Sequence, residues 1–155
     1  MKKIIYLIIL SLLVLYNLNT QSTIKASDKN KVNLVVDISG LDTNKGKVVI
    51  ALFNERCKDA FPDNFKNAYK VAKVSIKDNS VKYVFENIRT GYYAIAVHHD
   101  ENSNDIVDID DLGVPTEGFV VSGNSKNSLI LANYSNSEFK VTIDGTSIKI
   151  IMKYF

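Results

Sequence analysis

The feature that most constrains the fold of this chain is a succession of short segments in which apolar and polar residues alternate, separated by turn residues. The segment 31–39 places Val32, Leu34, Val36 and Ile38 on one face of an extended strand. The segment 47–54 is apolar almost throughout, which is typical of a central strand. No long amphipathic helical pattern occurs after residue 30. The chain is therefore predicted to be all-β.

Seven further segments show strand patterns: residues 69–76, 81–88, 92–99, 118–122, 128–134, 139–144 and 146–155. Gly145 separates the last two, which predicts a hairpin. Residues 55–69 contain Pro62 and are predicted to be a connection. Many short strands with turns between them indicate a sandwich or a barrel. We expect an antiparallel β-sandwich of the Greek-key kind, either immunoglobulin-like or transthyretin-like.

The first 26 residues have the three parts of a secretory signal peptide. A basic start, "MKK", precedes the apolar run "IIYLIILSLLVLYNL", and a polar region with small residues follows. An uncleaved membrane anchor is the competing interpretation. The run is shorter than the ~20 residues of a spanning helix, and Ser11 and Asn17 interrupt it. We expect cleavage after Ala26, a single β-sandwich domain at 27–155, and export to the periplasm, the cell surface or the medium.

The charge balance and the cysteine content limit the partners and the stabilising groups. The chain has 19 basic and 17 acidic residues, and residues 1–26 contain three of the lysines and no acid. Residues 27–155 therefore carry 16 basic and 17 acidic residues. No basic patch with interleaved aromatics remains, so no nucleic-acid partner is expected, and membrane contact is expected only through the signal segment. Cys57 is the only cysteine, which excludes an internal disulfide and makes a bound metal a candidate stabiliser.

The stretch "HHDENSNDIVDIDD", residues 98–111, contains five aspartates, one glutamate and two asparagines. Counted from Asp100, side-chain oxygens fall at positions 1, 3, 5, 9 and 12, and position 7 supplies a backbone carbonyl. This is the ligand spacing of an EF-hand calcium loop, in which alternate residues direct oxygens at one centre. The predicted calcium ligands are Asp100, Asn102, Asn104, Ile106, Asp108 and Asp111.

Two positions depart from the calcium-loop pattern. Asp105 occupies position 6, where glycine normally makes the sharp turn, although aspartate tolerates the left-handed conformation. Asp111 has a shorter side chain than the usual glutamate at position 12, and the neighbouring Asp110 is an alternative ligand. Magnesium or manganese, or a solvated acidic turn without an ion, are the alternatives to calcium.

Three polar residues flank this loop. His98 and His99 are neighbours in a strand and must point to opposite faces, so they are not expected to chelate one ion. We expect one of them to pack at the edge of the sandwich and the other to meet solvent. Glu117 is expected to close the loop or to hydrogen-bond to it.

These residues resemble the core motif of an uncharacterised bacterial family of exported β-proteins, domain of unknown function 2141. The matching residues are Gly91, Tyr93, Ala94, His99, Asp100, Glu101, Asn102, Asn104, Asp108, Gly113, Pro115 and Glu117. The resemblance implies a single exported β-domain with a signal peptide, and it carries no established activity. The chain departs from the family at Asp105, usually glycine, and at "FVVSGN", residues 119–124.

The leading hypothesis is an exported, non-enzymatic module. A calcium loop would stabilise a surface that contacts a protein or a glycan at the cell envelope. A metal-free interaction module is the first alternative. A hydrolase that uses His98 or His99 is the second, although no nucleophile motif accompanies them.

Overall fold

The computed structural model describes residues 30–123 and 132–155, so the predicted signal peptide at 1–26 lies outside the described residues. The strands are β1 (Lys31–Ser39), β2 (Lys47–Asn54), β3 (Lys70–Val74), β4 (Val81–Arg89), β5 (Gly91–Asp100), β6 (Gly118–Val121), β7 (Phe139–Val141) and β8 (Thr146–Ile151). The helical segments are η1 (Glu55–Ala60), η2 (Phe65–Asn67) and α2 (Tyr134–Ser137). None of the described helices has the length and apolar character needed to cross a membrane.

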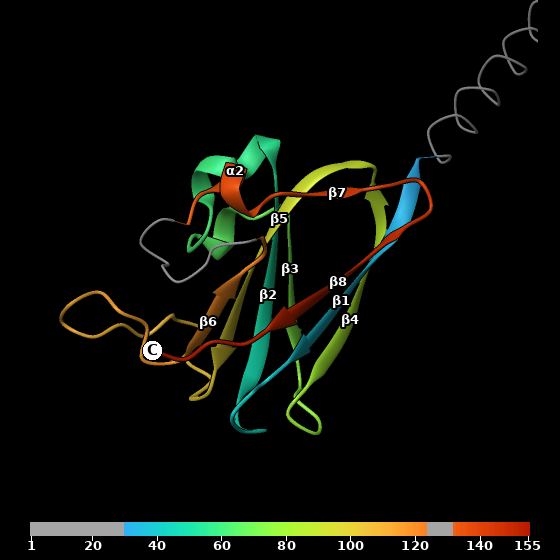
Figure 1. The fold of residues 1–155 in the computed structure, drawn as a ribbon. Helices are drawn as coiled ribbons and strands as arrows, with labels where there is room; N and C mark the ends of the chain where they lie inside the picture. Colours follow the sequence, from blue (N-terminus) through green and yellow to red (C-terminus); the bar gives the residue numbers. More distant parts are fainter. Residues whose placement is uncertain (1–29, 124–131) are drawn as a thin grey trace, which may run out of the picture. The chain divides into compact units, whose positions relative to one another are not determined.

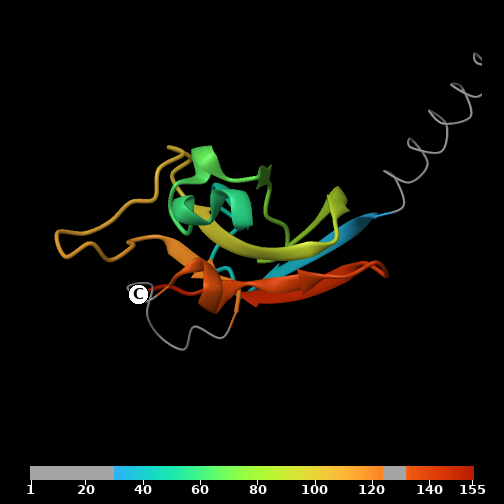
Figure 2. The same cartoon turned by 90° about the horizontal axis from the view of Figure 1, so that it is seen from above.

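The strands form the two sheets of a sandwich, as predicted (Figure 1). One sheet has the order β4-β1-β8. The other has the order β3-β2-β5-β6, and β7 also pairs with β5. Figure 2 shows β5 between the η1 and η2 segments on one side and β8 on the other. The five-stranded sheet is therefore the central layer of the domain.

The predicted hairpin at Gly145 is wrong. β7 pairs antiparallel with β5, whereas β8 pairs with β1 in the other sheet. Gly145 (φ 84°) makes the turn at which the chain changes sheets, and the Gly145 N–H donates to the Thr142 carbonyl. The β1–β8 pair is also parallel, so the expectation of antiparallel pairing does not hold there.

The alternation predicted for the first strands is confirmed by burial. Leu34, Val36 and Ile38 are fully buried between the sheets, and Val81 and Phe85 of β4 are buried with them. In β4 the alternation then shifts by one residue. Asn87 has a left-handed backbone (φ 57°), and Ile88 rather than Asn87 becomes buried.

The central strands β2 and β5 are apolar because both of their faces are covered. Ile50 and Ile95 face the core between the sheets, while Ala51, Phe53 and Ala96 belong to a second cluster on the outer face. The η1, η2 and α2 segments contribute to this second cluster. A strand buried on both faces reads as a continuous apolar run.

The chain between β2 and β3 contains no strand. The predicted connection at 55–69 is confirmed, and it contains η1 and η2. Cys57 is partly buried there, and its Sγ accepts from the Asn54 N–H at 3.3 Å. The strand predicted at 128–134 lies outside the described residues up to 131. For residues 132–134 the prediction is wrong, because none of them is in a strand. Tyr134 begins α2 because the Asn133 side chain caps that turn, accepting from the Asn136 N–H at 3.0 Å.

Candidate functional site

Asp100 is the last residue of β5 and is completely buried. The antiparallel register places it opposite Lys47, the first residue of β2. Gly46 (φ 67°) lies directly against this strand end, and a Cβ atom there would overlap the Asp100 carbonyl oxygen. The glycine therefore allows the chain before β2 to pack closely on the start of the acidic loop.

The Asp100 carboxylate anchors the loop that follows. Oδ1 accepts from the Asn104 N–H at 3.0 Å and Oδ2 from the Asp105 N–H at 3.1 Å. Asn102 Oδ1 accepts from the Asn104 N–H at 2.9 Å, and Asn104 Oδ1 accepts from the Ile106 N–H at 2.8 Å. Successive side chains thus fold the backbone into a tight loop around the carboxylate of Asp100.

Asp108 closes this loop from its far end. The Asn102 side-chain amide donates to Asp108 Oδ2 at 2.6 Å. The Asn104 amide donates to both carboxylate oxygens of Asp108, at 3.2 and 3.0 Å. The structure therefore brings together four of the predicted ligands: Asp100, Asn102, Asn104 and Asp108.

The predicted twelfth-position ligand lies in a different turn. Ile109 and Pro115 form an isolated antiparallel bridge, and the Gly113 N–H donates to the Asp110 carbonyl. Asp110 Oδ1 accepts from two N–H groups of this turn. Within the described part of the chain, no hydrogen bond joins the side chain of Asp110 or Asp111 to residues 100–108. The compact loop therefore spans nine residues, 100–108, rather than twelve.

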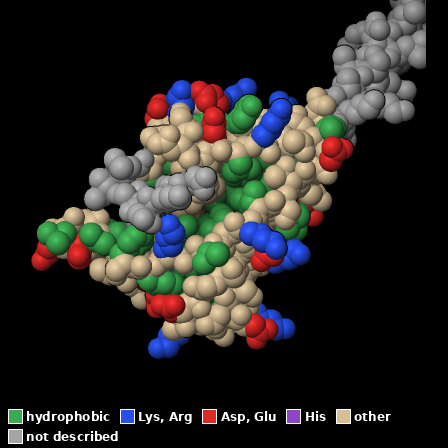
Figure 3. Space-filling model, viewed as in Figure 1, with side chains coloured by type: hydrophobic (Ala, Val, Ile, Leu, Met, Phe, Trp, Pro, Cys, Tyr) green, Lys and Arg blue, Asp and Glu red, His purple; other side chains and the backbone are tan. Residues whose placement is uncertain are grey.

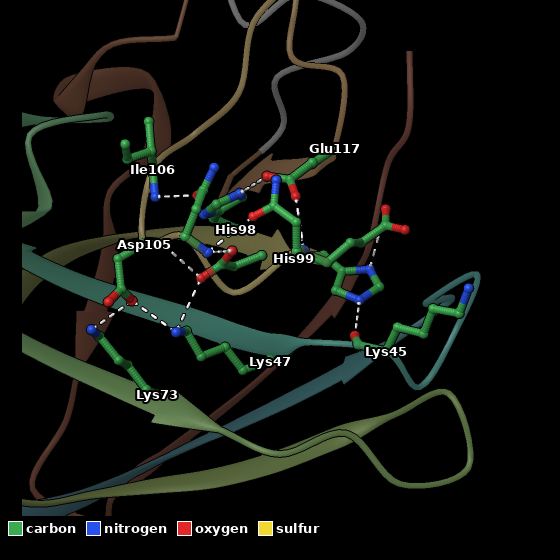
Figure 4. A network of polar contacts seen from close by, with 12 residues as sticks. Lys45, Lys47, Lys73, His98, His99, Asp105, Ile106 and Glu117 are labelled. Atoms are coloured by element: carbon green, nitrogen blue, oxygen red, sulfur yellow. Dashed lines mark hydrogen bonds and ion pairs between the residues drawn. The ribbon is translucent and has the colours of Figure 1, made fainter.

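Asp105 adopts the left-handed conformation that position 6 requires, with φ 64°. Its carboxylate points out of the loop, where Oδ1 lies 2.6 Å from Lys73 Nζ and 2.9 Å from Lys47 Nζ (Figure 4). The hydrogen bond from Lys73, followed by that from Lys47, lowers the pKa of Asp105 to about 2. Lys47 Nζ also lies 3.2 Å from Asp100 Oδ2. Neither lysine was predicted from the sequence, because only the strand register brings them to the loop.

Asp105→Asn is expected to remove part of the acid sensitivity of the fold. Folding lowers the pKa of Asp105 from 3.8 to about 2, so the unfolded state binds the proton more readily between these values. The stabilisation is present above about pH 4 and is lost as the pH falls towards about 2. Thermal unfolding of both proteins between pH 6 and pH 2 measures this, with Asp111→Asn as the control. If the Asp105→Asn protein lost as much stability between pH 6 and pH 2 as the unchanged protein, the lowered pKa of Asp105 would not be the cause of that loss.

Glu117 holds the start of the loop against β5. Oε1 accepts from the Glu101 N–H at 3.0 Å and from the Asn102 N–H at 3.4 Å, and Oε2 lies 2.7 Å from His98 Nε2. Glu117 presents a carboxylate oxygen to His98 Nε2, and this oxygen accepts, so that nitrogen carries the proton. The expectation that Glu117 hydrogen-bonds to the loop is confirmed.

The two histidines point to opposite faces of β5, as predicted, but neither meets solvent. His98 is 2% exposed and His99 is completely buried. His99 Nε2 lies 2.9 Å from the Lys45 carbonyl, which only accepts, so Nε2 carries the proton. His99 Nδ1 then accepts from the Tyr154 hydroxyl at 2.6 Å. The expectation of a solvent-facing histidine is wrong because the tertiary fold covers both faces at this strand end.

The donor chemistry of residues 100–108 fits a hard cation, although the carboxylates alone do not form a site. Among residues 30–123 and 132–155, no three His, Cys, Asp or Glu side chains lie together as a group able to hold a metal. The loop combines the carboxylates of Asp100 and Asp108 with the amide oxygens of Asn102 and Asn104. Carboxylate and amide oxygens are ligands that calcium accepts. In the structure the amide N–H groups point at the Asp108 carboxylate, where positive charge is favourable.

Comparison with known proteins agrees with the motif in β5 and the loop. The model of a bacterial family described as "uncharacterized protein conserved in bacteria (DUF2141)" matches residues 36–149. The chain belongs to this family. The match includes the strand β5, the loop at 100–108 and Glu117, so the DUF2141 domain contains the whole candidate site.

One uncharacterized protein is similar to part of the chain. An uncharacterized protein of Methanocaldococcus jannaschii is 31% identical over 72 residues, which are 46% of this chain and 30% of the relative. The chain thus matches less than a third of the length of this relative. No solved structure matches the chain.

Proposed function

We propose that the loop at residues 100–108 binds calcium and that the DUF2141 domain is an exported, non-enzymatic binding module. The observation that carries the proposal is the convergence of Asp100, Asn102, Asn104 and Asp108 around a nine-residue loop. The left-handed backbone of Asp105 also supports the calcium loop. Position 6 of such a loop needs a sharp turn, which glycine normally makes in this conformation. The proposed donors are these four side chains and the Ile106 carbonyl, without Asp111.

The proposed ion would serve as a structural support for the segment that projects beyond the sheets. Ile106, Ile109 and Leu112 in this segment are 62%, 60% and 87% exposed. Figure 3 shows hydrophobic and acidic side chains together on the projecting end. Exposed apolar side chains that lie together mark contact surfaces more often than isolated ones do. We therefore place the contact with a protein or a glycan of the cell envelope on this segment.

Thermal unfolding of the purified protein with chelator, calcium or magnesium tests the calcium loop. Two carboxylates indicate the weak extracellular class of sites, with dissociation constants of about 10⁻⁴–10⁻³ M. Calcium at ten times the dissociation constant adds about 1.4 kcal/mol to the free energy of unfolding. We expect the melting temperature to rise by about 4–6 °C with calcium and much less with magnesium. No calcium-specific rise at about 10 mM, ten times the upper dissociation constant, would reject the site and leave a metal-free interaction module.

Lys47→Gln is expected to strengthen calcium binding about three- to tenfold. The Lys47 ammonium lies 3.2 Å from Asp100 Oδ2 and opposes a second cation at that carboxylate. Calcium titration by calorimetry measures the change. Lys73→Gln is the matched control, because Lys73 forms its ion pair with Asp105, whose carboxylate points out of the loop. Weaker calcium binding by the Lys47→Gln protein, or equal gains in both variants, would show that Lys47 does not oppose the ion.

A further inference from the structure

A groove of about 900 Å³ lies on the outer face of the five-stranded sheet. Its floor contains Val49 of β2, Val71 and Lys73 of β3, and His98 of β5. One wall is formed by residues 63–66 and the other by Asp105, Ile106, Val107 and Ile109. The volume lies in the range of small-molecule sites.

Three apolar side chains of the groove are exposed to solvent, whereas Val49 on its floor is buried. Val71, Ile106 and Ile109 are 43%, 62% and 60% exposed, and each is among the most exposed large hydrophobic residues of the described chain. They come from β3 and from the loop that follows β5, and Phe65 adds an aromatic ring opposite them. An apolar ligand that covers these side chains would remove this surface from water.

His98 supplies a hydrogen-bond acceptor at the floor of the groove. Its Nε2–H donates to Glu117 at 2.7 Å, which leaves the lone pair on Nδ1. None of the described residues donates a hydrogen bond to Nδ1, although the His98 side chain is only 2% exposed. Among the described residues, the fully buried side-chain N or O atom without a partner is Ser137 Oγ, so His98 Nδ1 keeps contact with solvent. A ligand that covered Nδ1 without donating to it would bury an unpaired acceptor, so a ligand group that donates to Nδ1 is favoured.

We propose that this groove binds a small apolar molecule that carries one hydroxyl or N–H group, with that group donating to His98 Nδ1. The apolar part of the ligand would contact Val71, Ile106 and Ile109. The proposal rests on the proposed function only in that calcium at residues 100–108 would hold the wall at 105–109. The Glu117 carboxylate sets the direction of the hydrogen bond, because it fixes the proton of His98 on Nε2.

The pair 4-ethylphenol and 4-ethylanisole tests the proposal. The two molecules have nearly the same apolar surface, but only the phenol has an O–H donor. Titrations followed by backbone amide resonances are expected to locate both near Val49, Val71 and Lys73. The phenol is expected to bind about five- to tenfold more tightly, because the ether leaves Nδ1 without a donor. Equal affinities, or resonance shifts away from the groove, would overturn the proposal.

Glu117→Gln is expected to exchange the donor and acceptor roles of the two ring nitrogens of His98. The amide oxygen of the introduced side chain still accepts from the Glu101 and Asn102 N–H groups, and its NH₂ group donates to His98 Nε2. The proton of His98 then moves to Nδ1, which becomes a donor. The phenol and the ether are then expected to bind with about equal affinity. A retained preference would show that Nδ1 does not contact the hydroxyl. Side-chain ¹⁵N resonances of His98 establish the tautomer of each protein independently.

A pair of exposed isoleucines separates groove binding from general surface binding. Ile109→Ser removes one apolar side chain from a groove wall, and Ile143→Ser removes a comparably exposed isoleucine (54%) in the turn before Gly145. The phenol is expected to lose affinity about threefold in the first variant only. Equal losses in both variants would overturn the proposal.

Each titration is made with calcium and with chelator. Phenol binding in chelator without any calcium response would reject the calcium loop and retain the groove. A calcium response without phenol binding in either buffer would retain the calcium loop and reject the groove as a binding site.

Discussion

Asp100→Ala is expected to abolish calcium binding and to lower the free energy of unfolding by about 2–4 kcal/mol. The carboxylate is completely buried and accepts from two backbone N–H groups, at Asn104 and Asp105. Removing it leaves the Asp105 N–H without its partner and the Asn104 N–H with Asn102 Oδ1 alone, and it removes the counter-charge of Lys47 at 3.2 Å. It also removes the first of the proposed calcium donors. Asp100 belongs neither to the core between the sheets nor to the cluster on the outer face of the five-stranded sheet, so the domain is expected to remain folded.

Calorimetric calcium titration and urea unfolding, with and without calcium, measure these two effects. Asp111→Ala is the control, because Asp111 lies in the exposed turn at 110–113 and is not among the four converging side chains. It is expected to change stability by less than about 0.5 kcal/mol and to retain calcium binding. If Asp111→Ala abolished the calcium response and Asp100→Ala preserved it, the nine-residue loop would be the wrong assignment.

Glu117→Ala is expected to destabilise the domain by about 3 kcal/mol. The side chain accepts three N–H groups, from Glu101, Asn102 and His98, and the residue is 6% exposed. Alanine leaves all three donors without this acceptor in a largely buried position. The loop start is then no longer attached to the segment that carries Glu117, so calcium binding is expected to weaken as well.

Glu117→Gln separates the hydrogen bonds from the charge, since its amide oxygen still accepts from the two backbone N–H groups. It is expected to lose clearly less stability than Glu117→Ala in urea unfolding. Glu86→Ala, on an exposed position of β4, is the control for a surface glutamate. A Glu117→Ala protein as stable as the Glu86→Ala protein would show that the contacts of Glu117 contribute little.

Local patterns were sufficient for most of the strands. Alternation in 31–39 and in 81–85 requires a strand with one buried face, and both segments have it. The continuous apolar runs of β2 and β5 indicated central strands, and both are covered on two sides. The partner of each strand is not a local property. Gly145 between two strand patterns predicted a hairpin, yet the strands on its two sides pair in different sheets.

For the candidate loop, too, the sequence predicted one part and the tertiary structure decided the other. The spacing of Asp100, Asn102, Asn104 and Asp108 predicted side chains that converge, because a tight loop directs alternate residues to one centre. The spacing also placed Asp111 with them. The bridge between Ile109 and Pro115 instead starts a separate turn, in which Asp110 caps the backbone. A pattern of ligand positions assumes one continuous loop, and the backbone hydrogen bonds end this loop at Asp108.

The sequence by itself determined the all-β class, the central strands, the opposite orientation of His98 and His99, and the four converging side chains, because each depends on spacing along a few residues. Only the tertiary structure decided the contacts of Lys47, Lys73 and Tyr154, the burial of both histidines, and the groove beside His98. These depend on strand register and on packing between segments far apart in the chain. Burial and charge pairing at that distance leave no periodic signal in the sequence.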